Sequence, residues 1–136
     1  MSEAGGLGTI ALAGFSPDAI AAEISAARRI TAKPIVVNLL VPFLSPGILE
    51  TLARQPISAV TLFWGDPAEH IPVCESLDLR VIWQCGSALE AVAAKRAGAD
   101  AIVAQGFEAG GRKSRGHARI SIDSLTSPKI WRLKCG

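Results

Sequence analysis

The sequence predicts an α/β protein in which about five βα units follow one another around a parallel sheet. Apolar runs begin at intervals of 21 to 27 residues, near Gly8, Ile35, Val60, Val81 and Ile102, and helical patterns separate them. The runs do not alternate strictly with polar residues, which is typical of parallel strands covered on both faces. Such repeats form either a doubly wound sheet or a (β/α)₈ barrel. Five strands are too few to close that barrel, so a barrel here would be incomplete.

The segments between the strands carry helix signals. A serine followed by a proline predicts a helix start at 16–17 and again at 45–46. Ser87 and Glu90 form a capping-box pattern, and Gly98 predicts the left-handed end of that helix. In the first helix four apolar residues fall on one face: Ile20, Ile24, Ala27 and Ile30. Segment 67–78 is also read as a helix, although Pro72 interrupts its pattern.

Composition narrows the class of protein. The chain has 136 residues, enough for one domain with a buried core, and 49% of them are apolar, which excludes a disordered chain. The apolar runs are too short for a transmembrane helix, and no basic region precedes the first of them, so we expect a cytoplasmic protein. The cysteines lack metal-ligand spacing and are expected to be unpaired thiols: Cys74, Cys85 and Cys135.

Charge divides the chain into two predicted parts. Residues 1–111 carry seven basic and eleven acidic residues, a net charge of −4, whereas residues 112–136 carry seven basic residues and one acid, a net charge of +6. The second part also loses the periodic apolar pattern. We therefore predict a (β/α) domain over 1–111 and an irregular basic tail over 112–136. The tail has a single aromatic residue, Trp131, among its seven basic ones and matches no known nucleic-acid-binding module, so nucleic-acid binding is not expected.

Amide side chains recur near the carboxyl ends of the predicted strands, where α/β proteins bind ligands. They are Asn38, Gln84 and Gln105, and Trp64 follows the third strand. An amide offers a donor and an acceptor, which suits the edge of a neutral heteroaromatic ring such as a flavin or a pyrimidine. Taken singly, each could instead be a backbone cap, a solvated strand end or, for Trp64, a core residue. The glycine pair 110–111 could expose backbone N–H groups to a phosphate, or could be only a turn.

Four stretches in this order resemble the nitronate monooxygenase family: "AGGLGTIA" at 4–11, "KPIVVNLL" at 33–40, "LFWGDP" at 62–67 and "AGADAIVAQGFEAGG" at 97–111. The resemblance implies a TIM-type barrel, present here as about five βα units. It also implies an FMN-dependent enzyme that oxidises alkyl nitronates with O₂. By position, Asn38 would hydrogen-bond the flavin, Gln105 would contact the isoalloxazine edge, and Gly110 would bring its backbone against the cofactor.

The sequence departs from the family in three ways. The strand that usually precedes the first motif is missing, the later strands with the phosphate-binding turns are missing, and Arg112 stands where the family has its acid/base histidine. Arginine cannot act as a base near neutral pH. His117 lies five residues beyond that position, which is too far for a simple replacement. We therefore assign no catalytic residue and no metal, and we expect a truncated, impaired oxidoreductase.

Other readings remain open at this stage. The chain could be a non-catalytic remnant that associates with another chain, because an open sheet leaves exposed edges for self-association. A flavin-dependent enoyl reductase-like protein shares much of the same pattern, and a phosphate-binding barrel isomerase is a weaker alternative.

Overall fold

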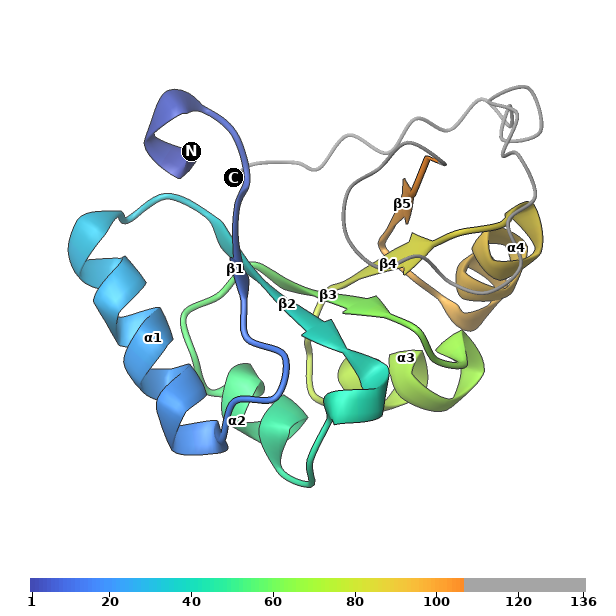
Figure 1. The fold of residues 1–136 in the computed structure, drawn as a ribbon, viewed down its shortest axis with the longest axis horizontal. Helices are drawn as coiled ribbons and strands as arrows, with labels where there is room; N and C mark the ends of the chain where they lie inside the picture. The colour runs from blue at the N-terminus through green and yellow to red at the C-terminus, as the bar shows by residue number, and fades with distance from the viewer. Residues whose placement is uncertain (107–136) are drawn as a thin grey trace.

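A computed structural model describes residues 1–106 of the chain, in which five strands alternate with helices (Figure 1). The strands are β1 (Gly8–Ala11), β2 (Ile35–Leu40), β3 (Ala59–Phe63), β4 (Val81–Cys85) and β5 (Ala101–Ala104). The helices are α1 (Pro17–Ile30), α2 (Ile48–Ala53), α3 (Pro67–Ser76) and α4 (Ala88–Ala97), together with the short 3-10 helices η1 (Ser2–Ala4) and η2 (Val41–Phe43). Each strand begins within one residue of its predicted start, so the predicted series of βα units is confirmed.

The strands form one parallel sheet in the order β1-β2-β3-β4-β5. The sheet therefore follows the order of the chain and nowhere reverses, as it would in a doubly wound fold. Within the described residues, β1 and β5 each pair with a single neighbour and are the edges of the sheet. This is the arrangement of a partial TIM-type barrel, and it confirms the predicted fold class.

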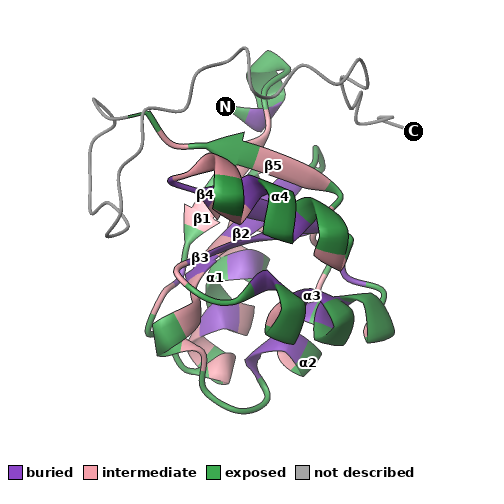
Figure 2. Cartoon of the chain, turned by 90° about the vertical axis from the view of Figure 1, so that its right-hand side faces the viewer, coloured by how far each residue is buried: buried purple, intermediate pink, exposed green. Residues whose placement is uncertain are grey.

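The four α-helices cover one face of the sheet, which we call the outer face (Figure 1). Side chains on this face lie in rows across neighbouring strands, one row being Leu39, Leu62 and Trp83. These three side chains are at most 1% exposed and pack in one core with Ile24 of α1 and Ile71 of α3. The central strands are accordingly buried, whereas β5 at the edge is partly exposed (Figure 2).

Two of the three predicted helix starts are confirmed. The Ser16 hydroxyl accepts a hydrogen bond from the Ala19 N–H at 3.3 Å, and the Ser87 hydroxyl accepts one from the Glu90 N–H at 3.2 Å. The Glu90 carboxylate reaches back to the Gly86 N–H at 2.7 Å, one residue earlier than a capping box requires. Gly98 ends α4 in the left-handed conformation with a φ of 102°, as predicted.

Three details of the helix prediction are wrong or incomplete. The second helix begins at Ile48 and not at 45–46, because Gly47 adopts a φ of 83° and forms the cap itself. Ile30 was predicted on one face of α1 with Ile20, Ile24 and Ala27, but it is 81% exposed and is the last residue of the helix, so the buried part of that face ends before it. Helix α3 forms despite Pro72, which leaves the Ala68 carbonyl without its usual helical donor.

Two side chains connect the amino ends of the strands. The Ser2 hydroxyl accepts a hydrogen bond from the Gly8 N–H at 2.9 Å and donates one to the Pro34 carbonyl at 2.7 Å. The Asp100 carboxylate accepts a hydrogen bond from the Val81 N–H at 2.7 Å. These contacts lie at the edge opposite to the carboxyl ends of the strands and fix β1 against β2 and β4 against β5.

The predicted irregular tail, 112–136, and the predicted boundary at residue 111 lie outside the described residues, as do Arg112, His117 and Cys135. Among residues 1–106, no helix has both the length and the apolar character that crossing a membrane requires.

Candidate functional site

The face of the sheet opposite to the helices, which we call the inner face, contains no charged residue. The strand register and the alternation of side chains give its twelve positions: Thr9, Ala11, Val36, Asn38, Leu40, Ala59, Thr61, Phe63, Ile82, Gln84, Ala101 and Val103. Its polar groups are only hydroxyls and amides. Such a surface can form hydrogen bonds with an uncharged ligand, but the described part offers no carboxylate or imidazole for acid–base chemistry.

Asn38 lies in β2 on this inner face, two residues before the end of the strand. It therefore lies near the carboxyl end of the strand, as predicted, and Leu39 and Leu40 complete the strand beyond it. Its neighbour in register is Thr61 of β3, a buried polar residue with 8% exposure. Asn38 is half-buried, and no hydrogen bond joins its side-chain amide to any other residue within 1–106. The amide is therefore available to a ligand over the inner face.

Gln105 follows β5 directly and continues its pairing, because its N–H donates to the Cys85 carbonyl at 2.9 Å. Alternation along the strand gives it the same direction as Ala101 and Val103, toward the inner face. It is half-buried. Its strand is three strand spacings from β2, and it lies four residues beyond Ala101, the residue in register with Asn38, so the two residues are on the order of 19 Å apart on the sheet. The structure thus brings both residues to one face but not into contact, and only a ligand of extended shape could touch both.

The third predicted cofactor residue, Gly110, lies outside the described residues. Gln84 lies in β4 on the inner face, half-buried, one residue before the end of its strand. Thr61 was missed in the sequence, because a single threonine inside the otherwise apolar run "AVTLF" is typical of a strand and carries no functional signal of its own. The strand register would have revealed it, since Thr61 pairs directly with Asn38.

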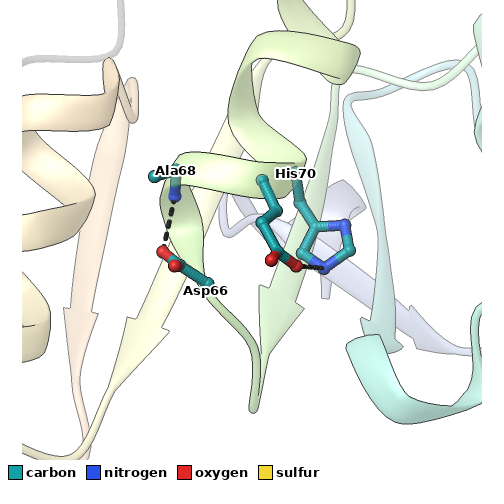
Figure 3. Close-up of polar contacts among 4 residues, drawn as sticks. Asp66, Ala68 and His70 are labelled. Atoms are coloured by element: carbon teal, nitrogen blue, oxygen red, sulfur yellow. Dashed lines mark hydrogen bonds and ion pairs between the residues drawn. The ribbon is translucent and has the colours of Figure 1, made fainter.

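Asp66, the acid that follows β3, serves as a helix cap. Its carboxylate accepts a hydrogen bond from the Ala68 N–H at 2.9 Å at the start of α3 (Figure 3). His70, the one histidine within 1–106, lies on the same helix with its Nε2 3.9 Å from the Glu69 carboxylate (Figure 3). Neither side chain is part of the inner face, so neither is placed to exchange a proton with a ligand there.

The two described cysteines, Cys74 and Cys85, are fully buried and unpaired. Burial raises the pKa of each thiol to about 11, and for Cys85 the nearby Glu90 carboxylate adds to this rise. Both are therefore protonated and unreactive at neutral pH. No group of three potential metal ligands occurs among the residues that the structure describes.

One cavity of about 240 Å³ lies at the amino ends of β4 and β5, away from this site. Its lining includes Arg80 and Asp100. Because the Asp100 carboxylate already binds the Val81 N–H, we assign this acid a structural role.

Comparison with known proteins agrees with this geometry. The family profile for nitronate monooxygenase matches residues 1–47. The predicted resemblance to nitronate monooxygenases is confirmed. The nitronate monooxygenase of Pseudomonas aeruginosa is 29% identical over 170 aligned positions, covering 92% of this chain and 48% of that protein. A probable nitronate monooxygenase of Staphylococcus saprophyticus is 30% identical, covering 83% of this chain and 42% of that protein.

Solved structures extend the likeness to three dimensions. FabK from Thermotoga maritima superposes with a TM-score of 0.72 and 35% identity over 81% of this chain and 36% of its own. Nitroalkane oxidase from Streptomyces ansochromogenes superposes with a TM-score of 0.72 and 27% identity over 91% of this chain and 45% of its own. The chain therefore spans less than half the length of these relatives, whose names include a monooxygenase and an oxidase.

Proposed function

We propose that residues 1–106 form the flavin-ring side of an FMN-dependent oxidoreductase of the nitronate monooxygenase type, which oxidises alkyl nitronates with O₂. The observation that supports this proposal is the inner face, where neutral amides and hydroxyls line an uncharged surface and Asn38 has no partner within 1–106. A bound flavin would supply the redox chemistry, which protein side chains cannot provide. The residues of this chain would bind and orient its ring.

Each side chain has a proposed part in that binding. The Asn38 amide would donate to and accept from the polar edge of the ring, beside the Thr61 hydroxyl. Gln105, at the far side of the sheet, would contact the isoalloxazine edge, and Gly110 would approach with its backbone. The absence of charge on the inner strands within 1–106 suits a ring that binds uncharged.

We further propose that the chain, by itself, binds FMN weakly and turns over poorly. Phosphate binding usually relies on backbone N–H groups at glycine turns and helix N-termini, and these supply much of the affinity for such a cofactor. The chain covers less than half of its relatives, and residues 1–106 place no acid–base group on the inner face. Residues 1–106 would therefore retain recognition of the flavin ring, whereas phosphate binding and proton transfer would be weak in this chain.

Titration of the full chain with FMN and with riboflavin, followed by flavin fluorescence, tests this separation. We expect weak binding of both, with at most a severalfold preference for FMN, and no oxygen uptake with an alkyl nitronate. Asn38→Ala should weaken both affinities about tenfold, the value of one hydrogen bond to a ligand. The matched control is Gln55→Ala, which deletes an amide side chain that follows α2 and lies away from the inner face. A stoichiometric yellow protein with steady turnover would refute the impairment, and no flavin binding at all would refute the function.

A second candidate function is association with another copy of the chain through the open sheet edges. The observation that favours it is that β1 and β5 each have one pairing partner, while Val103 of β5 and Leu89 and Val92 of α4 are 46%, 84% and 46% exposed. Exposed strand edges beside apolar side chains promote pairing between chains. Analytical ultracentrifugation should then show dimers or larger species, which Val103→Lys on the edge should dissociate. A monomer at all concentrations would exclude this function.

An enoyl reductase-like activity would differ in its substrate from the nitronate oxidation proposed above, and it would differ from chain association in being catalytic. Oxidation of a reduced nicotinamide cofactor in the presence of an enoyl thioester, with no oxygen uptake from a nitronate, would favour it.

A further inference from the structure

Trp64, directly after β3, has an unusual backbone. Its φ is 66°, in the left-handed region that non-glycine residues rarely adopt, and within 1–106 only Asp78 shares this property among non-glycine residues. A bulky residue in this region carries a conformational cost on the order of 1–3 kcal/mol. Such strain persists only where the surroundings fix it, and it is concentrated at functional sites.

The unusual φ changes the direction of the Trp64 side chain. Neighbouring residues of a strand point to opposite faces, and Phe63 is on the inner face, paired with Leu40 and 4% exposed. Yet the rings of Phe63 and Trp64 lie side by side, with their centroids 5.0 Å apart and their planes tilted by 34°. Trp64 has therefore left the alternation of the strand, and its ring stands beside Phe63 at the inner side of the carboxyl end of β3.

Both residues that follow hold this conformation in place. Gly65 lies so close to η2 that a Cβ atom there would be 2.5 Å from Cγ1 of Val41. Asp66 is fixed as the cap of α3 by its 2.9 Å hydrogen bond (Figure 3). The backbone that follows the aromatic pair is therefore fixed against η2 and at the start of α3.

The indole N–H of Trp64 lacks an acceptor. Nε1 is inaccessible to solvent, and it is the one buried side-chain nitrogen or oxygen within the described residues that has no hydrogen-bond partner. Leaving such a donor unpaired costs about 1–3 kcal/mol, so native proteins rarely keep one without a reason. A ligand that supplies the acceptor would remove this cost on binding.

We infer that Trp64 is a ligand-positioning residue. With Phe63 it forms an aromatic wall at the carboxyl end of β3, and its indole N–H donates a hydrogen bond to an acceptor atom of a planar, uncharged heteroaromatic ring. The inference rests on the proposed flavin function, and it adds a donor from β3 to the amide of Asn38 on β2. An indole N–H donates only, so it recognises a carbonyl oxygen or an unprotonated ring nitrogen.

The test uses riboflavin, which has the ring and no phosphate, with the full chain labelled with ¹⁵N at its indole nitrogens. The Trp64 resonance, assigned by its absence in Trp64→Phe, should move downfield as riboflavin is added, while that of the outer-face Trp83 should stay. Trp64→Phe keeps an aromatic ring but lacks the donor, so its riboflavin affinity should fall about tenfold.

The outcomes separate the two proposals. If the wild-type chain binds riboflavin while the Trp64 resonance stays fixed and Trp64→Phe binds equally well, the role of Trp64 is refuted and the flavin function stands. If the wild-type chain binds neither riboflavin nor FMN, both are refuted, and binding of FMN without riboflavin would refute ring recognition by Trp64 alone. The shift is measured in the wild-type protein, and circular dichroism of Trp64→Phe shows whether that variant is folded and can be used for the assignment and for the affinity comparison.

Discussion

The outer and inner faces of the sheet are made by alternate residues of the same five strands, yet they differ in chemistry. The outer face is apolar, and Val37, Leu62 and Trp83 are buried against the helices. Within 1–106 the inner face carries Thr61, an Asn38 amide without a hydrogen-bond partner, and no charged side chain. Because the two sets alternate along each strand, one strand packs against the helices through its outer face and, under the proposed function, would present polar side chains to a ligand through its inner face. Stability and ligand binding should then respond to different substitutions.

The largest effect is expected on the outer face. Trp83→Ala should lower the free energy of unfolding by about 3–5 kcal/mol, because it empties a site that is 1% exposed. Unfolding in urea measures this change. Leu89→Ala is the control, since Leu89 is 84% exposed and its truncation should change stability by less than about 0.5 kcal/mol. Equal effects of the two substitutions would contradict the assignment of the core.

The buried thiols should make the outer layer sensitive to alkaline pH. Burial raises the pKa of Cys74 and of Cys85 to about 11 from the ordinary value of 9.0. The folded state therefore holds these protons more tightly than the unfolded state, so stability is complete below pH 9 and falls as the pH rises from 9 to 11. The loss should be on the order of 2 kcal/mol for each thiol.

Thermal unfolding between pH 8 and pH 11 measures this loss. The Cys74→Ala and Cys85→Ala double variant is the reference, and its melting temperature should decline less steeply over that range. Parallel curves for the two proteins would show that these thiols titrate normally.

A smaller effect is expected at a helix start. Ser87→Ala removes the acceptor of the Glu90 N–H and should cost about 1 kcal/mol in the free energy of unfolding. Ser87→Asp, which retains an acceptor at the helix N-terminus, should keep most of that stability. If both variants lose the same amount, the hydroxyl contributes no cap.

The smallest effect on stability is expected on the inner face. A substitution there gives the sharpest test of the difference between the outer and inner faces. Asn38→Leu removes an amide that has no partner within 1–106, so the free energy of unfolding should change by less than about 0.5 kcal/mol or should rise. Riboflavin affinity should nevertheless fall about tenfold. A variant that loses stability and keeps riboflavin binding would reverse the roles of the two faces.

Much of the outer face could be predicted from the sequence, because the relevant signals are local. Apolar runs located all five strands. Ser16, Ser87 and Gly98 located helix ends, because each of these caps involves backbone groups only a few residues away in the sequence. The inner face could be predicted only in part. Asn38 and Gln105 were selected as amides, but Thr61 depends on the register between strands, which sequence periodicity does not contain.

The errors have physical causes of the same kind. Gly47 displaced the helix start from Ser45 by adopting a left-handed backbone, which competes with the serine cap. Trp64 follows the third strand as predicted, but the sequence did not reveal its φ of 66°, which accompanies the placement of its ring beside Phe63. Backbone conformations at single residues depend on their three-dimensional surroundings, so the sequence pattern does not reveal them.

The order of the strands also bears on how the protein folds as it leaves the ribosome. Gly8 pairs with Ile35 and Ile82 pairs with Ala101, separations of 27 and 19 residues, and each new strand adds beside the one synthesised before it. Each pairing can form as soon as its second strand emerges, because none within 1–106 awaits a partner from a later unit. In a nascent chain that grows in this way, the edge left by each new strand is covered when the next strand emerges, which shortens the interval in which that edge can aggregate.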